Sequence, residues 1–144
     1  MAFNAQAVAD AIKTKLLALS GMGSVQIGVP ESVGPRVSAY ITMGSMPSVR
    51  KTTEVVRREA RYFVNMAYRV DGAETTAETT LMGLADAFLS ALYADLTLGG
   101  TCKSIEIDTG LADTPDYQLR AGKEYREYPF IITAAQDGNY TVSP

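Results

Sequence analysis

Few side chains of this 144-residue chain have the chemistry that catalysis or metal binding requires. The sequence has no histidine, which is the commonest general base and the commonest transition-metal ligand in proteins. Its one cysteine, Cys102, can form neither an internal disulfide nor, by itself, a zinc site. No serine lies in a Gly-x-Ser-x-Gly elbow. We therefore expect no catalytic residue, no cofactor and no metal.

Three weaker chemical candidates have simpler structural interpretations. The glycines of GMGSVQIG (residues 21–28) follow a predicted helix and precede a strand, which is the reverse of a dinucleotide fingerprint. Asp108, Asp113 and Asp116 lack the spacing of a calcium loop, so we interpret them as solvated carboxylates. Lys103 beside Cys102 could lower a thiol pKa, but a buried structural cysteine is the simpler interpretation.

Composition indicates one soluble globular domain, residues 1–144, made in a cytoplasm. Hydrophobic residues make up 47% and charged residues 20% of the chain, both ordinary values. The net charge of −3, with 13 Lys and Arg residues, gives no chain-wide signal for nucleic acid. The N-terminal apolar residues are interrupted by Asp10, Lys13 and Lys15, unlike those of a signal peptide. No apolar stretch approaches the roughly 20 residues that span a bilayer, so no membrane contact is expected.

A basic cluster is the strongest candidate for a binding site. Five of the 13 cationic residues lie within twelve positions, interrupted by Glu54 and Glu59: Arg50, Lys51, Arg57, Arg58 and Arg61. In a strand, Arg57, Glu59 and Arg61 would share one face and Arg58 the other. The cluster could be a solvated face that protects a sheet edge, a salt-bridging surface for a neighbouring subunit, or a contact to DNA phosphates in a ring lumen.

The hydrophobic pattern predicts an α+β fold in the order α-β-β-β-α-β-β. Asn4 caps a predicted helix, and a mainly antiparallel sheet carries both helices on one face. The expected elements are a helix over 5–20, strands over 25–29, 37–43 and 52–70, a helix over 77–92, and strands over 103–109 and 124–135. Residues 110–122 are expected to form a loop, and 136–144 a flexible or docking C-terminal tail. Pro129 suggests a local edge or a bulge in the last strand.

The predicted strand over 52–70 is too long for a compact body. Its 19 residues would extend over roughly 60 Å at about 3.3 Å per residue. A compact domain of this size is only about 38 Å across. Either a bulge bends the strand, or its first half projects in a β-hairpin paired with the strand before Gly44. We favour a projecting hairpin with its tip near Met46 and Pro47, able to reach another subunit.

The order of the predicted elements and several short sequence stretches resemble those of one family of proteins. The strand ending in RYFVNMAYRV leads into the amphipathic segment ETTAETTLMGLADAFLSALYADL, and KSIEIDTG and REYPFIITA follow. With the N-terminal helix and the long hairpin, this order, over about residues 4–135, resembles the tail terminator (tail completion) proteins of long-tailed bacteriophages. No diagnostic motif of that family can be assigned residue by residue.

The resemblance implies a structural, non-enzymatic function in the virion. Proteins of that family form hexameric rings that cap the tail tube, stop its polymerisation and present a surface to the head-side connector. The implied partners are further copies of this chain, the tail tube protein and the head-side connector or stopper protein, with DNA passing through the lumen without specific binding. The residues expected at the interface are Met46, Pro47, Arg50, Lys51, Arg57, Arg58 and Arg61.

Other functions remain open from the sequence alone. A head-tail connector, or another neck or tube protein, would share the oligomeric character and differ in partner. A small-molecule binding module on an α+β scaffold would have a defined apolar pocket with converging polar groups. An enzyme that used carboxylates alone is the least favoured interpretation.

Overall fold

The first helix shows how local sequence sets the ends of elements in this chain. In the computed structural model, α1 (Ala5–Leu17) begins where the side chain of Asn4 accepts a hydrogen bond from the backbone N–H of Ala7 at 3.1 Å. It ends before the predicted Ser20. The apolar residues at helical spacing form one stripe, of which Val8, Ala9, Ile12 and Leu16 are buried and Ala5 and Leu19 are partly buried. The structure describes residues 4–29, 37–50, 52, 55–70, 74–108, 116–120 and 123–139.

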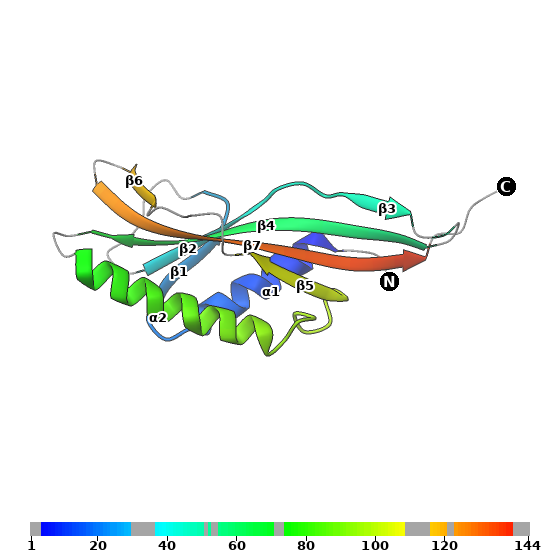
Figure 1. The fold of residues 1–144 in the computed structure, drawn as a ribbon, viewed down its shortest axis with the longest axis horizontal. Coiled ribbons are helices and arrows are strands. Elements are labelled where there is room, and N and C mark those ends of the chain that lie inside the picture. Colours follow the sequence, from blue (N-terminus) through cyan, green and yellow to red (C-terminus); the bar gives the residue numbers. More distant parts are fainter. Residues whose placement is uncertain are drawn as a thin grey trace.

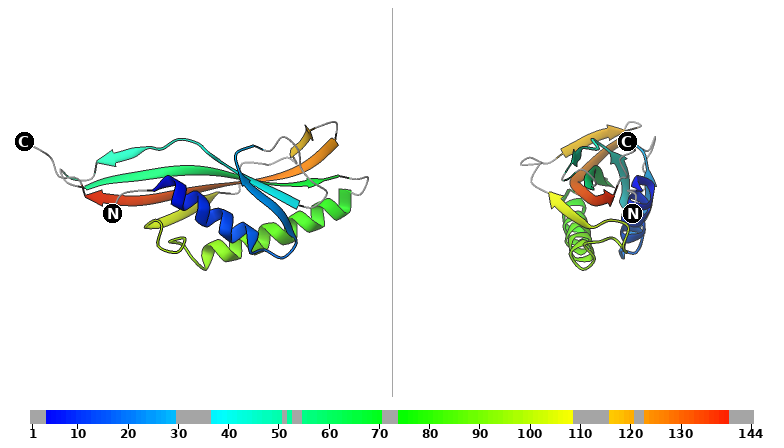
Figure 2. Two further views of the ribbon diagram at one scale, coloured as in Figure 1. Left: turned by 180° about the vertical axis from the view of Figure 1, so that it is seen from behind. Right: turned by 90° about the vertical axis from the view of Figure 1, so that its right-hand side faces the viewer.

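One sheet forms the second layer of the fold, with its strands in the order β1-β2-β4-β7-β5. Its strands are β1 (Met22–Ile27), β2 (Val37–Met43), β4 (Val55–Arg69), β5 (Ser104–Asp108) and β7 (Lys123–Asn139), with β3 (Ser48–Arg50) on β4 and β6 (Asp116–Arg120) on β7. The β1–β2 pair is parallel, and the other pairs are antiparallel. The second helix, α2 (Glu74–Tyr93), lies with α1 on one face of this sheet (Figure 1; Figure 2). The predicted fold class is confirmed.

The core lies between the helices and the sheet. Phe88 of α2 meets Phe130 of β7 edge to face, with ring centroids 5.2 Å apart, which is a favourable geometry for two aromatic rings. Alternation in the long strand places Tyr62, Val64 and Met66 on one face, and all three are buried. Cys102 is buried in the same cluster, as expected of a structural cysteine. We call the surface of the sheet opposite the helices the outer face.

Polar contacts stabilise the sheet at the end away from the tip of the long hairpin. The Tyr40 hydroxyl contacts both carboxylate oxygens of buried Glu127, at 3.2 and 3.0 Å. The adjacent Arg126 lies on the helix side, where its Nε is 2.5 Å from Oε1 of Glu78 on α2. A buried charge is costly unless it is paired, so the Arg126–Glu78 contact helps to fix how α2 docks on β7. Nothing in the sequence spacing predicted either contact.

The long strand β4 pairs with β7 without interruption. Its register holds from Val55 opposite Asn139 to Arg69 opposite Tyr125, so β4 contains no bulge relative to β7. Fifteen residues at about 3.3 Å each extend over about 50 Å. A one-residue shift does occur, but between β2 and β3, where Met43 pairs with Tyr62 and Ser48 with Arg58. The extra residue therefore lies in the segment 44–47.

The position of the hairpin tip was predicted wrongly. Met46 and Pro47 are not at the turn, because β3 continues beyond them and Arg50 pairs with Val56. The backbone N–H of Thr52 donates to the Val55 carbonyl at 3.2 Å, so the chain reverses between Arg50 and Val55. The glycine and proline of the segment 44–47 mark the extra residue of a bulge instead of a reversal.

Two other segments also differ from their predictions. Residues 116–120, expected in a loop, form β6, while the other loop residues lie outside the described part of the chain. Residues 136–139, expected in a C-terminal tail, belong to β7 and pair with β4 as far as Val55; residues 140–144 lie outside the described part. Both segments are polar, so partner strands set their structure where side-chain patterns did not. Pro129 occupies the predicted local edge, because among the described residues it pairs only with Asn65 of β4.

Replacing Phe130 by Ala should lower the free energy of unfolding by about 3–5 kcal/mol, because its fully buried ring leaves a cavity against Phe88. Phe63, which is 37% exposed on the outer face, is the matched control and should cost less than half as much on the same change. Urea unfolding followed by circular dichroism measures both. Equal losses would contradict the placement of the core.

Stability at alkaline pH should depend on Tyr62. Burial, followed by the charge of Cys102, raises the pKa of Tyr62 from 10.0 to about 12, and its hydroxyl donates to the Ala5 carbonyl at 2.8 Å. Since the folded pKa lies above the unfolded value, this contribution is complete below pH 10 and is lost as the pH rises towards 12. Melting temperatures of Tyr62→Phe should therefore fall less over that range than those of the wild type. Parallel curves would rule out this role.

Candidate protein interface

Three strand segments extend beyond the two-layer body as an arm. We define the arm as β3 together with residues 55–59 of β4 and 136–139 of β7. It begins where β5 ends its pairing, because Ser104 lies opposite Ala135 and Ala135 opposite Glu59. Residues 55–59 are all partly exposed, whereas Ala60, the next residue, is completely buried. Figures 1 and 2 show β3, β4 and β7 continuing past both helices. The projecting hairpin of the prediction is therefore a three-stranded arm.

The structure distributes the predicted interface residues along this arm. Met46, which is 36% exposed, and Pro47 lie in the bulged segment before β3. Arg50 is on β3, Arg57 and Arg58 are on the arm part of β4, and Arg61 follows within the body. Lys51 lies outside the described residues.

Strand alternation divides the basic cluster between two faces. Arg58 pairs with Ser48, and Arg50 with Val56, so both arginines share the face that carries Ala60 and Tyr62 towards the helices. Arg57 and Arg61 lie on the outer face, as predicted. The cluster in the sequence is therefore not one basic patch in space.

The outer face of the arm is charge-balanced. Nε of Arg57 lies 3.3 Å from Oε1 of Glu59, and Nζ of Lys103 lies 2.7 Å from Oδ2 of Asp137, the residue opposite Arg57. Such partly exposed pairs contribute only about 0–1 kcal/mol each to stability, but they cancel the local positive potential. This balance favours a protein partner over DNA phosphate, which requires an uncompensated positive surface.

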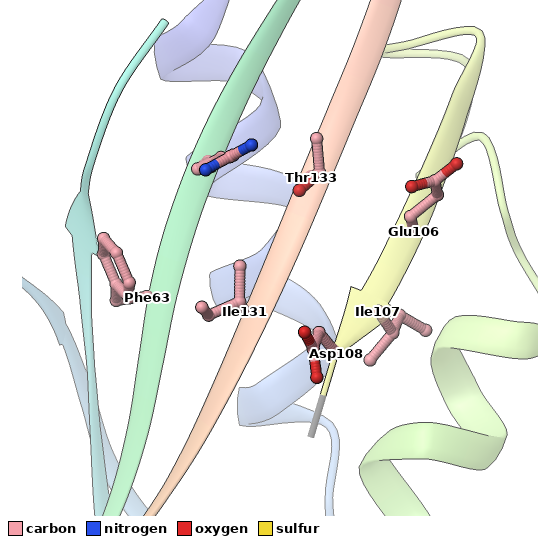
Figure 3. A pocket seen from close by; sticks show the side chains of 7 residues that line it. Phe63, Glu106, Ile107, Asp108, Ile131 and Thr133 are labelled. Atoms are coloured by element: carbon pink, nitrogen blue, oxygen red, sulfur yellow. The ribbon is translucent and has the colours of Figure 1, made fainter. Parts of the chain in front are cut away.

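Further along the outer face lies a shallow groove that crosses β4, β7 and β5. We call it the outer groove. Its volume is about 550 Å³, and its lining residues are Arg61, Phe63, Glu106, Ile107, Asp108, Ile131 and Thr133 (Figure 3). Arg61 is exposed and makes no side-chain hydrogen bond or ion pair within the described part of the chain. An apolar floor with an arginine and carboxylates at its rim resembles the composition of protein interfaces.

Sequence reasoning identified only Arg61 among these lining residues. The signal for the groove was Phe63, an aromatic residue on the otherwise polar side of the long strand. Thr133, Glu106 and Ile131 come from strands far away in the sequence. Only the sheet register places them beside Arg61 and Phe63.

Gly44 accommodates the ring of Phe63. A Cβ atom at residue 44 would lie 2.5 Å from Cε2 of Phe63, which is closer than carbon atoms can approach. The backbone N–H of Gly44 also donates to the Arg61 carbonyl at 2.7 Å, so the backbone here cannot easily move away. The glycine therefore acts through its small size, which leaves room for the exposed aromatic side chain beside it.

Cys102 and Asp95, whose pKa values are also shifted, take part in contacts that hold the fold together. Burial raises the pKa of the Cys102 thiol, and its Sγ contacts the Thr97 carbonyl at 3.5 Å. Hydrogen bonds from the Gly99 N–H and from Lys15 lower the pKa of Asp95, which joins α1 to the loop after α2. No group of three or more metal-ligating side chains is found among the described residues. No helix in the described ranges is long and apolar enough to cross a membrane.

Comparison with known proteins does not assign this chain to a family. No protein-family model matches the sequence, and a search of curated proteins finds no match.

Replacing Gly44 by Ala should lower the free energy of unfolding by about 1–3 kcal/mol, because the new Cβ atom overlaps the Phe63 ring. Combining this change with Phe63→Leu should recover most of the loss, since the ring is then absent. Chemical unfolding of the wild type, both single variants and the double variant forms the thermodynamic cycle. Simple additivity of the two losses would contradict the contact.

Proposed function

We propose that this chain is a structural virion protein of the tail terminator kind. It forms a ring that caps the phage tail tube, ends polymerisation of the tube and joins it to the head-side connector. The observation that supports this proposal is the uninterrupted β4–β7 pairing, which carries a three-stranded arm beyond the body. An arm of this kind presents strand edges and side chains to a neighbouring molecule at a distance from its own core.

The distribution of surfaces is consistent with assembly into a ring. The arm and the body are different surfaces, so a contact between them is heterologous, and such contacts close into rings when the rotation allows it. The charge-balanced outer face of the arm suits a protein neighbour. DNA would pass through the lumen without specific binding, and no step of this function requires catalysis.

A head-tail connector, or another neck or tube protein, is the nearest alternative, because it would use the same assembling surfaces with a different partner. A small-molecule binding module is the alternative of a different class. It is favoured by the volume of the outer groove, about 550 Å³, which lies in the range of ligand sites. The two classes differ in oligomeric state, since a ring function requires a defined oligomer and a binding module does not.

The mass in solution tests this proposal directly. Light scattering or native mass spectrometry should give a species near six times the 15.4 kDa monomer. The triple variant Arg57→Ser, Arg58→Ser, Arg61→Ser should remain folded by circular dichroism and shift towards monomer. Replacing the same three residues by Lys keeps the charge and is the matched control for the role of the guanidinium groups.

A monomer at every concentration, both alone and with tail tubes, would refute the ring function. Rings formed normally by the folded serine variant would remove the three arginines from the interface and leave the ring itself unaffected.

A further inference from the structure

The margin of the sheet formed by β1 is an uncharged strand edge. Within the described residues β1 pairs only with β2, so its other side carries no strand. From Met22 to Val29 the sequence has no charged residue, whereas β5 at the opposite margin carries Glu106 and Asp108. Edges that must not associate are normally protected by charges, prolines or bulges. In β1 the register shifts at Met22–Ser24, at the start of the strand. The rest of the edge, from Ser24 to Ile27, is uncharged and is therefore suited to accept a further strand.

An apolar groove lies beside this edge, between α1 and the ends of β1 and β2. We call it the edge groove; its lining residues are Ala5, Gln6, Ala9, Ile27, Ile41, Met43 and Tyr62. Ile27 is 46% exposed, Met43 52% and the nearby Val29 58%. The groove volume is about 180 Å³. Since a cavity of about 150 Å³ holds a benzene ring, the edge groove is the size of one aromatic side chain and too small for a typical ligand.

We propose that the edge groove binds the C-terminal segment of a second copy of this chain, with Tyr140 in the groove and the backbone added alongside β1. The described part of β7 ends at Asn139, at the tip of the arm, and the sequence continues as Tyr140-Thr141-Val142-Ser143-Pro144. In an extended strand, Tyr140 and Val142 project on the same side, as an apolar groove beside a strand edge requires. The segment has no charged side chain to desolvate.

The segment cannot fill the groove of its own molecule. Tyr62, which lines the groove, pairs with Ile132, while Asn139 lies seven residues further along β7, or about 24 Å. One Cα step spans only about 3.8 Å, far less than this separation. Tyr140 is one such step from Asn139. The occupant must therefore come from another molecule.

This contact would make the assembly directional. The donor lies at the tip of the arm and the acceptor lies on the body, so each copy gives one segment and receives one. Such a head-to-tail contact closes into a ring or continues as a filament, depending on the rotation that it imposes. The inference rests on the self-assembly proposed above and assigns that assembly to one groove and one segment.

The first test measures binding between the two parts. A labelled peptide of residues 136–144 is titrated with the full-length chain carrying Tyr140→Ser and Val142→Ser, whose own segment cannot compete, and anisotropy reports binding. Ile27→Lys in that background should weaken binding at least about tenfold, because it places a charge at the groove and on the edge. Met82→Lys is the matched control, since Met82 is 63% exposed on α2, away from the groove, and it should leave binding unchanged.

The second test is the mass in solution of the full-length Tyr140→Ser, Val142→Ser variant, which should be lower than that of the wild type at equal concentration. No peptide binding up to millimolar concentration, or equal binding by the Ile27→Lys and Met82→Lys variants, would overturn the proposal. Phe3 lies two residues before Ala5, which lines the groove. Peptide binding that appears only after Phe3→Ser would also overturn the proposal, because the N-terminal segment of the same chain would then be the occupant of the groove.

The two tests separate this inference from the ring function. Oligomers that form equally well with Tyr140→Ser and Val142→Ser would refute the use of the edge groove and leave the ring function standing. Specific peptide binding by a wild-type chain that stays monomeric above the Kd of the peptide would overturn both proposals, because the segment of the full-length chain would then not reach a second copy.

Discussion

The structure depends on one uninterrupted antiparallel pairing, that of β4 with β7. Both strands are longer than the body is wide, and their register holds over all 15 residues of β4. Each backbone hydrogen bond contributes a net of only about 0.5–1.5 kcal/mol, but a continuous series keeps both strands extended after the helices end. The body and the arm therefore share one continuous pair of strands, and the outward reach of the arm follows from the register.

The two faces of this strand pair have different functions. Towards the helices, alternate residues of β4 and β7 form the core with the stripes of α1 and α2. On the outer face, the same strands carry Arg57, Arg61 and Phe63 with their neighbours from β5 and β7. Because side chains alternate strictly, a one-residue slip of the register would exchange these faces. The core that stabilises the fold therefore also fixes which side chains the outer face exposes.

Three surface features would serve the proposed self-assembly. The arm is charge-balanced, the outer groove combines an aromatic ring with an arginine and carboxylates, and the β1 edge is uncharged beside an apolar groove. The ionisable groups with altered pKa values have structural causes, namely burial for Cys102 and Tyr62 and hydrogen bonding for Asp95. The proposed contact with other protein chains would account for the arm, the outer groove and the β1 edge with one kind of function.

The sequence by itself determined what short-range periodicity can encode. The cap at Asn4, the α1 stripe, the inward face of Tyr62, Val64 and Met66, and the excess length of the long strand were all predictable, because each depends on residues close together in the chain. Only the tertiary structure decided the partners. In the structure the hairpin tip lies beyond Arg50 and not at Met46–Pro47, and residues 136–139 belong to β7. The arginines are divided between two faces, and Glu106 and Thr133 lie beside Arg61. Strand pairing joins residues that are far apart in the sequence, and side-chain alternation specifies the face of a strand but not its neighbour.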